Sequence, residues 1–265
     1  MFVGMASRRE IDTTVAHIAR VYDYWLGGSS NYEVDRQAAK RAAEANPVVL
    51  QGVHGNRAFL ARAVRYLASA GIRQFLDIGA GIPGNGNTHE IARSVAPDAR
   101  VAYVDNDPVV FAAAESVLAE AGDGVGYADA DARDTGEVLA RAGQMLDLGQ
   151  PVGVLMIAVL HCIPDADDPW AVARAVAGAM PPGSYLALTH PSYDWHPERA
   201  AAGVSRLNAM MAQQLTFRPR EQVLRFFDGL ELVPPGLVRA PEWRPDSAAD
   251  PANPAEMWGG VAIKR

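Results

Sequence analysis

The stretch from residue 74 to residue 90 limits the possible folds more than any other part of the chain. A short apolar run leads to Gly79 and Gly81, and Asn87 with Glu90 three residues later forms a helix-start pattern. Glycines let the backbone approach a ligand closely, and the free N–H groups of a helix N-terminus favour negative charge. The stretch therefore predicts a buried strand, a tight turn and a helix that begins near Asn87.

Strand-like and helix-like segments alternate over most of the chain. Apolar runs typical of strands occupy residues 74–78, 100–105, 125–127, 152–160, 185–189, 230–233 and 257–263. Helical patterns occupy residues 88–95, 108–121, 135–145, 168–180, 197–214 and 220–227. This alternation predicts an α/β fold with an open, mostly parallel sheet and helices on both faces. The proline-rich residues 234–255 are expected to form a surface loop.

The first 70 residues are predicted to be helical. Helical patterns cover residues 11–26, 33–45 and 47–70, with a glycine break after the first. We expect residues 1–70 to form a helical cap with lead-in helices, and residues 71–265 to form the main domain. Tyr22 and Tyr24 belong to an aromatic cluster beside the glycine break. Either their rings pack the cap onto the main domain, or the segment folds over a site and presents a tyrosine hydroxyl.

Five chemically active side chains follow predicted strands: Asp77, Asp105, Asp131, His161 and His190. In open parallel sheets, ligands bind beyond the carboxyl ends of the strands. Because these ends meet at one edge of the sheet, we expect the five side chains to line one site.

Asp105 and Asp77 indicate the kind of ligand. A carboxylate after the second strand can accept hydrogen bonds from both vicinal hydroxyls of a ribose, and the 21 positions from Gly84 to Asp105 fit a dinucleotide fold as well. The carboxylate of Asp77 would repel a pyrophosphate but attract an ammonium and a sulfonium group. Asp77 therefore favours S-adenosylmethionine over NAD. Asp131 either accepts a hydrogen bond from an adenine amino group or caps a turn.

Composition excludes several other classes of protein. The net charge of −7 and the absence of a dense Lys/Arg cluster argue against a nucleic-acid partner. The single cysteine, Cys162, excludes an internal disulfide and a multi-cysteine zinc site, and the scattered histidines lack the spacing of metal ligands. The start of the chain lacks the apolar core of a signal peptide, and the longest apolar run, residues 152–163, is too short to cross a bilayer. We expect a soluble, cytoplasmic protein with neither a membrane nor a metal partner.

Several segments resemble those of a known family. Residues 77–81, 103–105, 130–132 and 160–165 resemble the successive ligand motifs of class I S-adenosylmethionine-dependent methyltransferases. More narrowly, residues 20–28, 71–79, 87–90, 103–108 and 182–186 look like the actinobacterial DUF574 family of methyltransferases. The resemblance runs from about residue 17 to the C-terminus. It implies a Rossmann-like, seven-stranded sheet with the last strand antiparallel, plus an N-terminal helical cap.

The resemblance also implies a cofactor, S-adenosyl-L-methionine, with S-adenosyl-L-homocysteine as its product. The implied cofactor-binding residues are Asp77, Gly79, Ala80, Gly81, Asp105, Asn106, Asp131, Ala132, Leu160 and His161. One departure concerns the glycine turn, where Pro83 followed by Gly84 replaces the usual third glycine. The resemblance supplies no methyl acceptor and no oligomeric state.

Methyl transfer requires little from the protein beyond aligning the acceptor with the methyl group and excluding water. A base is needed only when the acceptor is a hydroxyl or a protonated amine. His161 and His190 are the candidate bases, although each can instead pack or cap backbone, and His161 can line the cofactor pocket. Tyr22 and Tyr24 are candidates for orienting the acceptor.

Three functions are compatible with these observations. The first is an S-adenosylmethionine-dependent methyltransferase that acts on an oxygen or nitrogen atom of a small molecule. The second is a non-catalytic sensor or partner-binding module that binds the cofactor or its demethylated product. The third, an NAD-dependent oxidoreductase, is disfavoured by Asp77.

Overall fold

The computed structural model describes residues 10–84, 86–246 and 255–265. Within these residues the strands form one sheet in the order β3-β2-β1-β4-β5-β8-β6, with β7 also paired to β8. Strands β1 to β5 pair with one another in parallel, whereas β8 is antiparallel to β5, β6 and β7. The strands are β1 (Gln74–Ile78), β2 (Arg100–Asp105), β3 (Val125–Asp129), β4 (Gly153–Ile157), β5 (Tyr185–Pro191), β6 (Glu231–Leu232), β7 (Val238–Arg239) and β8 (Met257–Ile263). The expected mostly parallel α/β sheet is confirmed.

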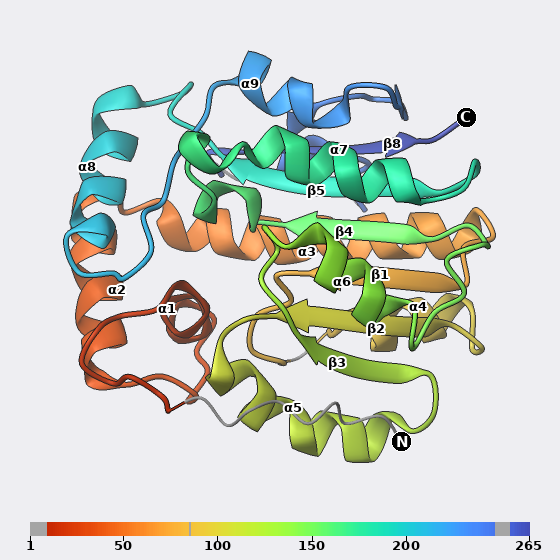
Figure 1. The fold of residues 1–265 in the computed structure, drawn as a ribbon. Coiled ribbons are helices and arrows are strands. Elements are labelled where there is room, and N and C mark those ends of the chain that lie inside the picture. Colours follow the sequence, from red (N-terminus) through yellow and green to blue (C-terminus); the bar gives the residue numbers. More distant parts are fainter. Residues whose placement is uncertain (1–9, 85, 247–254) are drawn as a thin grey trace.

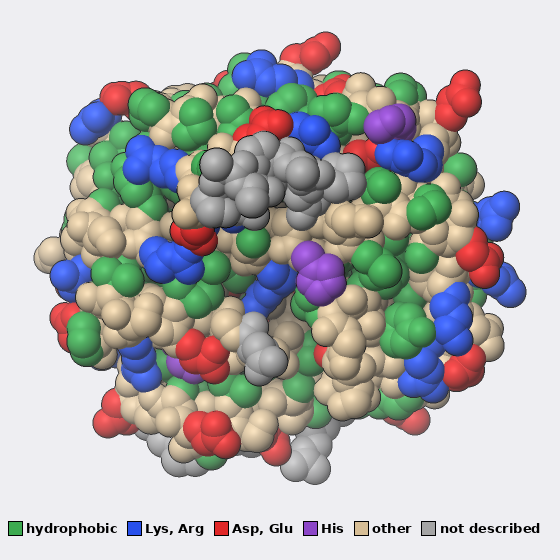
Figure 2. All heavy atoms as spheres, turned by 180° about the vertical axis from the view of Figure 1, so that it is seen from behind, with side chains coloured by type: hydrophobic (Ala, Val, Ile, Leu, Met, Phe, Trp, Pro, Cys, Tyr) green, Lys and Arg blue, Asp and Glu red, His purple; other side chains and the backbone are tan. Residues whose placement is uncertain are grey.

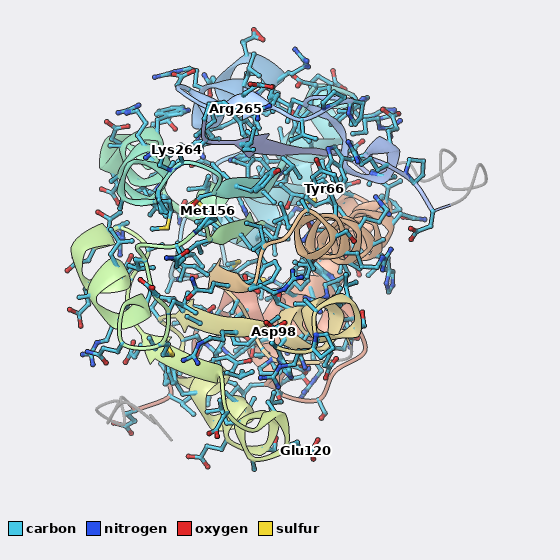
Figure 3. All side chains as sticks on the ribbon, turned by 90° about the vertical axis from the view of Figure 1, so that its right-hand side faces the viewer. Tyr66, Asp98, Glu120, Met156, Lys264 and Arg265 are labelled. Carbon is cyan, nitrogen blue, oxygen red and sulfur yellow. The ribbon has the colours of Figure 1, made fainter. Side chains whose placement is uncertain are left out.

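Helices cover both faces of the sheet. On one face lie α3 (Val49–Ser69), α4 (Thr88–Val95) and α5 (Pro108–Ala121), whose apolar side chains share a buried cluster with β1, β2 and β8. On the other lie α6 (Thr135–Ala142), α7 (Pro169–Ala179) and α9 (Arg220–Leu224). Figure 3 shows the sheet between these two layers, with Tyr66 marking α3 and Glu120 marking α5. Strand β1 is buried along its whole length, which explains its continuous apolar pattern.

Three further helices form a cap, α1 (Ile18–Trp25), α2 (Glu33–Ala45) and α8 (Pro197–Asn208). Figure 1 shows the cap at the end of the sheet toward which the parallel strands point. Val21, Trp25, Ala39 and Leu207 belong to its own apolar cluster. Helix α3 packs mainly on the sheet, and Val49 and Val53 at its start also belong to the apolar cluster of the cap.

Two segments differ from the expectation. The predicted strand 152–160 ends at Ile157, because Ala158 adopts a positive φ of 51° and the chain turns into a short 3-10 helix at Leu160–Cys162. Part of the expected surface loop 234–255 is buried, since it contains β7 and the fully buried Trp243. The Trp243 ring packs edge-on against Phe59, 5.4 Å between centroids. Residues 247–254 of this loop lie outside the described part of the chain.

No helix in the described ranges is both long and apolar enough to cross a bilayer. On the face shown in Figure 2, acidic and basic side chains are interspersed.

Candidate functional site

A cavity of about 930 Å³ lies between the cap and the carboxyl ends of the strands. Its floor consists of the residues that follow β1, β2, β3 and β4, and its roof includes α1 and the start of the segment after it. Residues 54, 56, 57 and 60 of α3 and residues 212–214, after α8, complete the wall. The volume falls in the upper part of the range of ~300–1,000 Å³ that is usual for small-molecule sites.

The turn after β1 brings backbone, without side chains, to the cavity floor. Gly79 has φ of +72°, and a Cβ atom there would lie 2.3 Å from Cγ2 of Val159, so only glycine fits. The N–H of Gly81 donates to Oδ2 of Asp105 over 2.8 Å, which connects the turn to the end of β2. The expected capping box of Asn87 and Glu90 is present at the start of α4.

Asp77 is buried at the end of β1 and lines the cavity. The hydroxyl of Thr88 donates to its Oδ2 over 2.6 Å. Burial raises the pKa of the Asp77 carboxyl to about 6, and the nearby Arg57 guanidinium opposes this rise. Arg57 also lines the cavity and donates to the carbonyl oxygen of Gly86 over 2.8 Å. A carboxylate and a guanidinium thus face the same part of the cavity.

The ends of β2 and β3 supply a second polar group of residues. Asp105 is buried, and burial raises its pKa although its Oδ1 accepts a hydrogen bond from the N–H of Asp107. Asn106 donates to Oδ2 of Asp131 over 3.2 Å. Arg133 forms an ion pair with Asp131 of 2.7 Å, and its hydrogen bonds lower the pKa of that carboxyl. These residues line the cavity, as do the expected Ala80 and Ala132.

His161 and His190 do not line the cavity, and neither does Leu160. Both histidines are buried behind its wall, 6.0 Å apart between ring centroids. Burial and the positive charge of Arg218 lower the pKa of His161 to about 3. Burial also lowers the pKa of His190, whose Nδ1 contacts the carbonyl oxygen of Pro191 over 2.8 Å and whose Nε2 faces Arg218 over 3.0 Å. The geometry therefore supports the packing interpretation of both histidines and not their role as bases.

Of the two candidate tyrosines, only Tyr22 lines the cavity. Its hydroxyl accepts a hydrogen bond from Nδ2 of Asn56 over 2.7 Å, and burial raises its pKa. Asn56 in turn accepts from the hydroxyl of Thr189, at the end of β5, over 2.6 Å. This chain of bonds fixes Tyr22 beside the ends of β4 and β5. Tyr24 is half-buried and packs against the apolar cluster of the cap.

The sequence analysis missed His17, Asn56, Arg57, Gln213 and Gln214 as cavity residues. A signal existed for Asn56, because it is a polar residue on the apolar face of α3, three positions before Phe59. No comparable signal marks His17, since its place in the cavity depends on how the cap packs. Among the described residues, no group of three or more His, Cys, Asp or Glu could hold a metal ion.

Comparisons with known proteins agree with this geometry. The family model described as S-adenosyl methyltransferase matches residues 4–265. A DUF574 family protein from Streptomyces avermitilis is 39% identical, with a TM-score of 0.91 over 97% of this chain and 100% of that chain. A protein from Thermobifida fusca is 38% identical, with a TM-score of 0.88 over 96% of this chain and 97% of that chain. Comparison with curated proteins gives no match.

More distant structures share the fold alone. An O-methyltransferase family protein from Burkholderia thailandensis is 14% identical, with a TM-score of 0.54 over 86% of this chain and 62% of that chain. The 1,6-didemethyltoxoflavin-N1-methyltransferase of the same organism, solved with its substrate and S-adenosylhomocysteine, is 17% identical, with a TM-score of 0.50 over 98% of this chain and 97% of that chain. The fold is that of class I methyltransferases.

Proposed function

The chain belongs to the S-adenosyl methyltransferase family, and we propose that it transfers a methyl group from S-adenosylmethionine to a small molecule enclosed beneath α1. The observation that carries this proposal is the convergence of Asp77, Asp105 and Asp131 on one cavity, at the ends of three adjacent strands. The cofactor would supply an electrophilic methyl group on a sulfonium, so the protein needs chiefly to bind, align and exclude water.

The residues present fit the cofactor. Buried Asp77 suits its ammonium group, and Arg57, on the same part of the wall, suits its carboxylate. Asp105 suits the ribose hydroxyls, and Asp131 suits an amino group of adenine. The same residues do not fit NAD, because the buried carboxylate of Asp77, beside the glycine turn, would face its pyrophosphate.

The strand order supports an acceptor site at the other end of the cavity. The adenosyl part would lie over β2 and β3, and the amino-acid part over β1, which leaves the ends of β4 and β5 for the acceptor. Tyr22, Asn56, Cys162 and Ile163 line or support this acceptor end. Burial raises the pKa of Tyr22 and raises that of Cys162 to about 12, so both are protonated at neutral pH. Neither group can therefore act as a base at neutral pH. Tyr22 would orient the acceptor, and the attacking atom of the acceptor must have a free lone pair without first losing a proton.

Calorimetric titration with S-adenosylmethionine, S-adenosylhomocysteine and NAD tests the proposal. We expect the two sulfur ligands to bind and NAD not to bind. The variant Asp105→Asn should weaken the binding of both sulfur ligands by about tenfold or more, since it removes an ionised hydrogen-bond acceptor for the ribose. Asp98→Asn is the matched control, because Asp98 is an exposed carboxylate at the opposite end of the sheet (Figure 3). Binding of NAD alone would refute the proposal.

Because Tyr22 and Cys162 are both protonated, neither supplies a base at this end of the cavity, which is also compatible with a second function, ligand binding without catalysis. Tritium transfer from methyl-labelled S-adenosylmethionine to small molecules extracted from an actinobacterium distinguishes the two. Labelled product supports the transferase. Binding of S-adenosylhomocysteine without any transfer supports a sensor.

A further inference from the structure

His17 is the residue that joins the cap to the adenosyl end of the cavity. It immediately precedes α1 and lines the cavity. Its Nδ1 lies 2.6 Å from Oδ2 of Asp107, which caps the N-terminus of α5. The backbone N–H of Asp107 donates to the carboxylate of Asp105, the proposed ribose acceptor. A single carboxylate therefore separates His17 from the residue expected to hold the ribose.

Buried charges fix the position of His17. Its backbone N–H donates to Oδ1 of Asp35 over 3.0 Å, and Asp35 is fully buried. Nε of Arg20 lies 3.7 Å from Asp35 and 3.6 Å from Asp107, and the Arg20 side chain also donates to two backbone carbonyls. Because Arg20 and Asp107 are also buried, this network holds the imidazole at the cavity wall.

The second ring nitrogen of His17 remains for a ligand. Nδ1 lies against Asp107 and accepts a hydrogen bond of 3.4 Å from the backbone N–H of Ala19, and no residue of the described part of the chain hydrogen-bonds Nε2. The positive charge of His17 acts on Asp105, lowering its pKa against the effect of burial. An imidazole nitrogen held in this position is suited to form a hydrogen bond with a hydroxyl group, which can both donate and accept.

We infer that His17 contacts the ribose of the bound cofactor, so that the cap supplies part of the adenosyl site. This inference rests on the proposed function. A ribose offers two vicinal hydroxyls, which would form hydrogen bonds with the carboxylate of Asp105 and with Nε2 of His17. Cofactor binding and packing of the cap are then linked, because each stabilises the other by the same free energy.

Adenosine isolates the ribose contact from the amino-acid part of the cofactor. The variant His17→Gln keeps a side chain of similar length but loses the imidazole contact with Asp107. His196→Gln is the control, since His196 also contacts a carboxylate, that of Glu256, but does not line the cavity. We expect His17→Gln to weaken the binding of adenosine and of S-adenosylhomocysteine by the same factor, about 3- to 10-fold. His196→Gln should change neither affinity by more than about twofold.

Three other outcomes are decisive. Unchanged affinities in His17→Gln overturn the inference, and loss for S-adenosylhomocysteine but not for adenosine also overturns it, because His17 would then act through the cap. Failure of the native protein to bind either ligand refutes the proposed function instead. A second measurement does not depend on folding of the variant: in the native protein, adenosine should shift the imidazole proton resonances of His17 and leave those of His196, outside the cavity, unchanged.

Discussion

Replacing Asp77 by Asn should stabilise the protein while impairing its cofactor site. Burial raises the pKa of Asp77 from 3.8 to about 6, so keeping the side chain ionised at neutral pH costs the folded state free energy. The difference of about two pH units corresponds to about 3 kcal/mol at ~1.4 kcal/mol per unit. Asn has the same shape, and its Oδ1 can still accept from the hydroxyl of Thr88. We expect about 1 to 3 kcal/mol of this cost to be recovered.

The pH dependence identifies the cause. Because the folded-state pKa of Asp77 is raised, its cost is fully present above pH 6 and disappears as the pH falls through 6 toward 4. The Asp77→Asn variant should therefore melt roughly 2 to 8 °C higher than the native protein at pH 7.5. The two melting temperatures should converge near pH 4.

Thermal melts followed by circular dichroism between pH 4 and 8 measure this effect, with Asp98→Asn as a control that should show no gain. In parallel, calorimetry should show S-adenosylhomocysteine binding at least about tenfold weaker in Asp77→Asn, because the partner of its ammonium group has lost its charge. A variant that melts at or below the native temperature at pH 7.5 would refute the electrostatic argument. Native affinity would refute the assignment of the ammonium group to Asp77.

Three further substitutions test other parts of the site. Arg218→Met should lower the free energy of unfolding in urea by about 2 to 4 kcal/mol, because the buried guanidinium bonds two carbonyls of the turn after β4; a loss below about 1 kcal/mol would contradict this. Gly79→Ala should weaken the binding of S-adenosylhomocysteine at least about tenfold in calorimetry, since the new Cβ would overlap Val159. A native affinity would show that the turn can shift to accommodate the Cβ atom. Thr189→Val should cost about 1 to 3 kcal/mol by leaving Oδ1 of Asn56 without its donor. Its affinity for S-adenosylhomocysteine should stay within about twofold of native, and a larger loss would place Asn56 at the cofactor end.

The central sheet and the carboxylates that line the cavity could be predicted because their signals are local. The apolar run of β1, the glycine turn and the capping box lie within 17 residues, and the cavity carboxylates lie at or just after strand ends. The same rule failed for His161. Ala158 reverses the chain with a positive φ, so the residues after β4 wind into a 3-10 helix, and His161 faces the interior. Strand periodicity carries no information about a side chain beyond such a turn.

The cap illustrates a different limit. Its helices were predictable from their periodicity, but α2 packs against α8, and this pairing joins segments far apart in the chain. Trp243 shows the same limit, because its burial against Phe59 depends on α3 and not on its proline-rich surroundings. The residues next to His17 in the sequence do not indicate a role for it, and His17 reaches Asp107 only because of how the cap packs.

Helix α1 forms part of the cavity roof. In the proposed arrangement, His17 lies at the adenosyl end and Tyr22, five residues later, at the acceptor end, about 7.5 Å away along the helix axis. A ligand that holds His17 therefore also holds the helix that positions Tyr22. We expect S-adenosylhomocysteine to slow amide hydrogen exchange in α1 and to leave α9, on the far side of the sheet, unchanged.

The matched variant separates this coupling from simple occupancy of the cavity. In His17→Gln, at ligand concentrations that saturate the site, protection of α1 should be smaller than in the native protein, whereas protection of the glycine turn should be equal. Equal protection of α1 in both proteins would show that the cap packs independently of the cofactor. Smaller protection confined to α1 would mean that the acceptor end is completed only after the cofactor has bound, since the hydroxyl of Tyr22 is fixed there by α1 and Asn56 together.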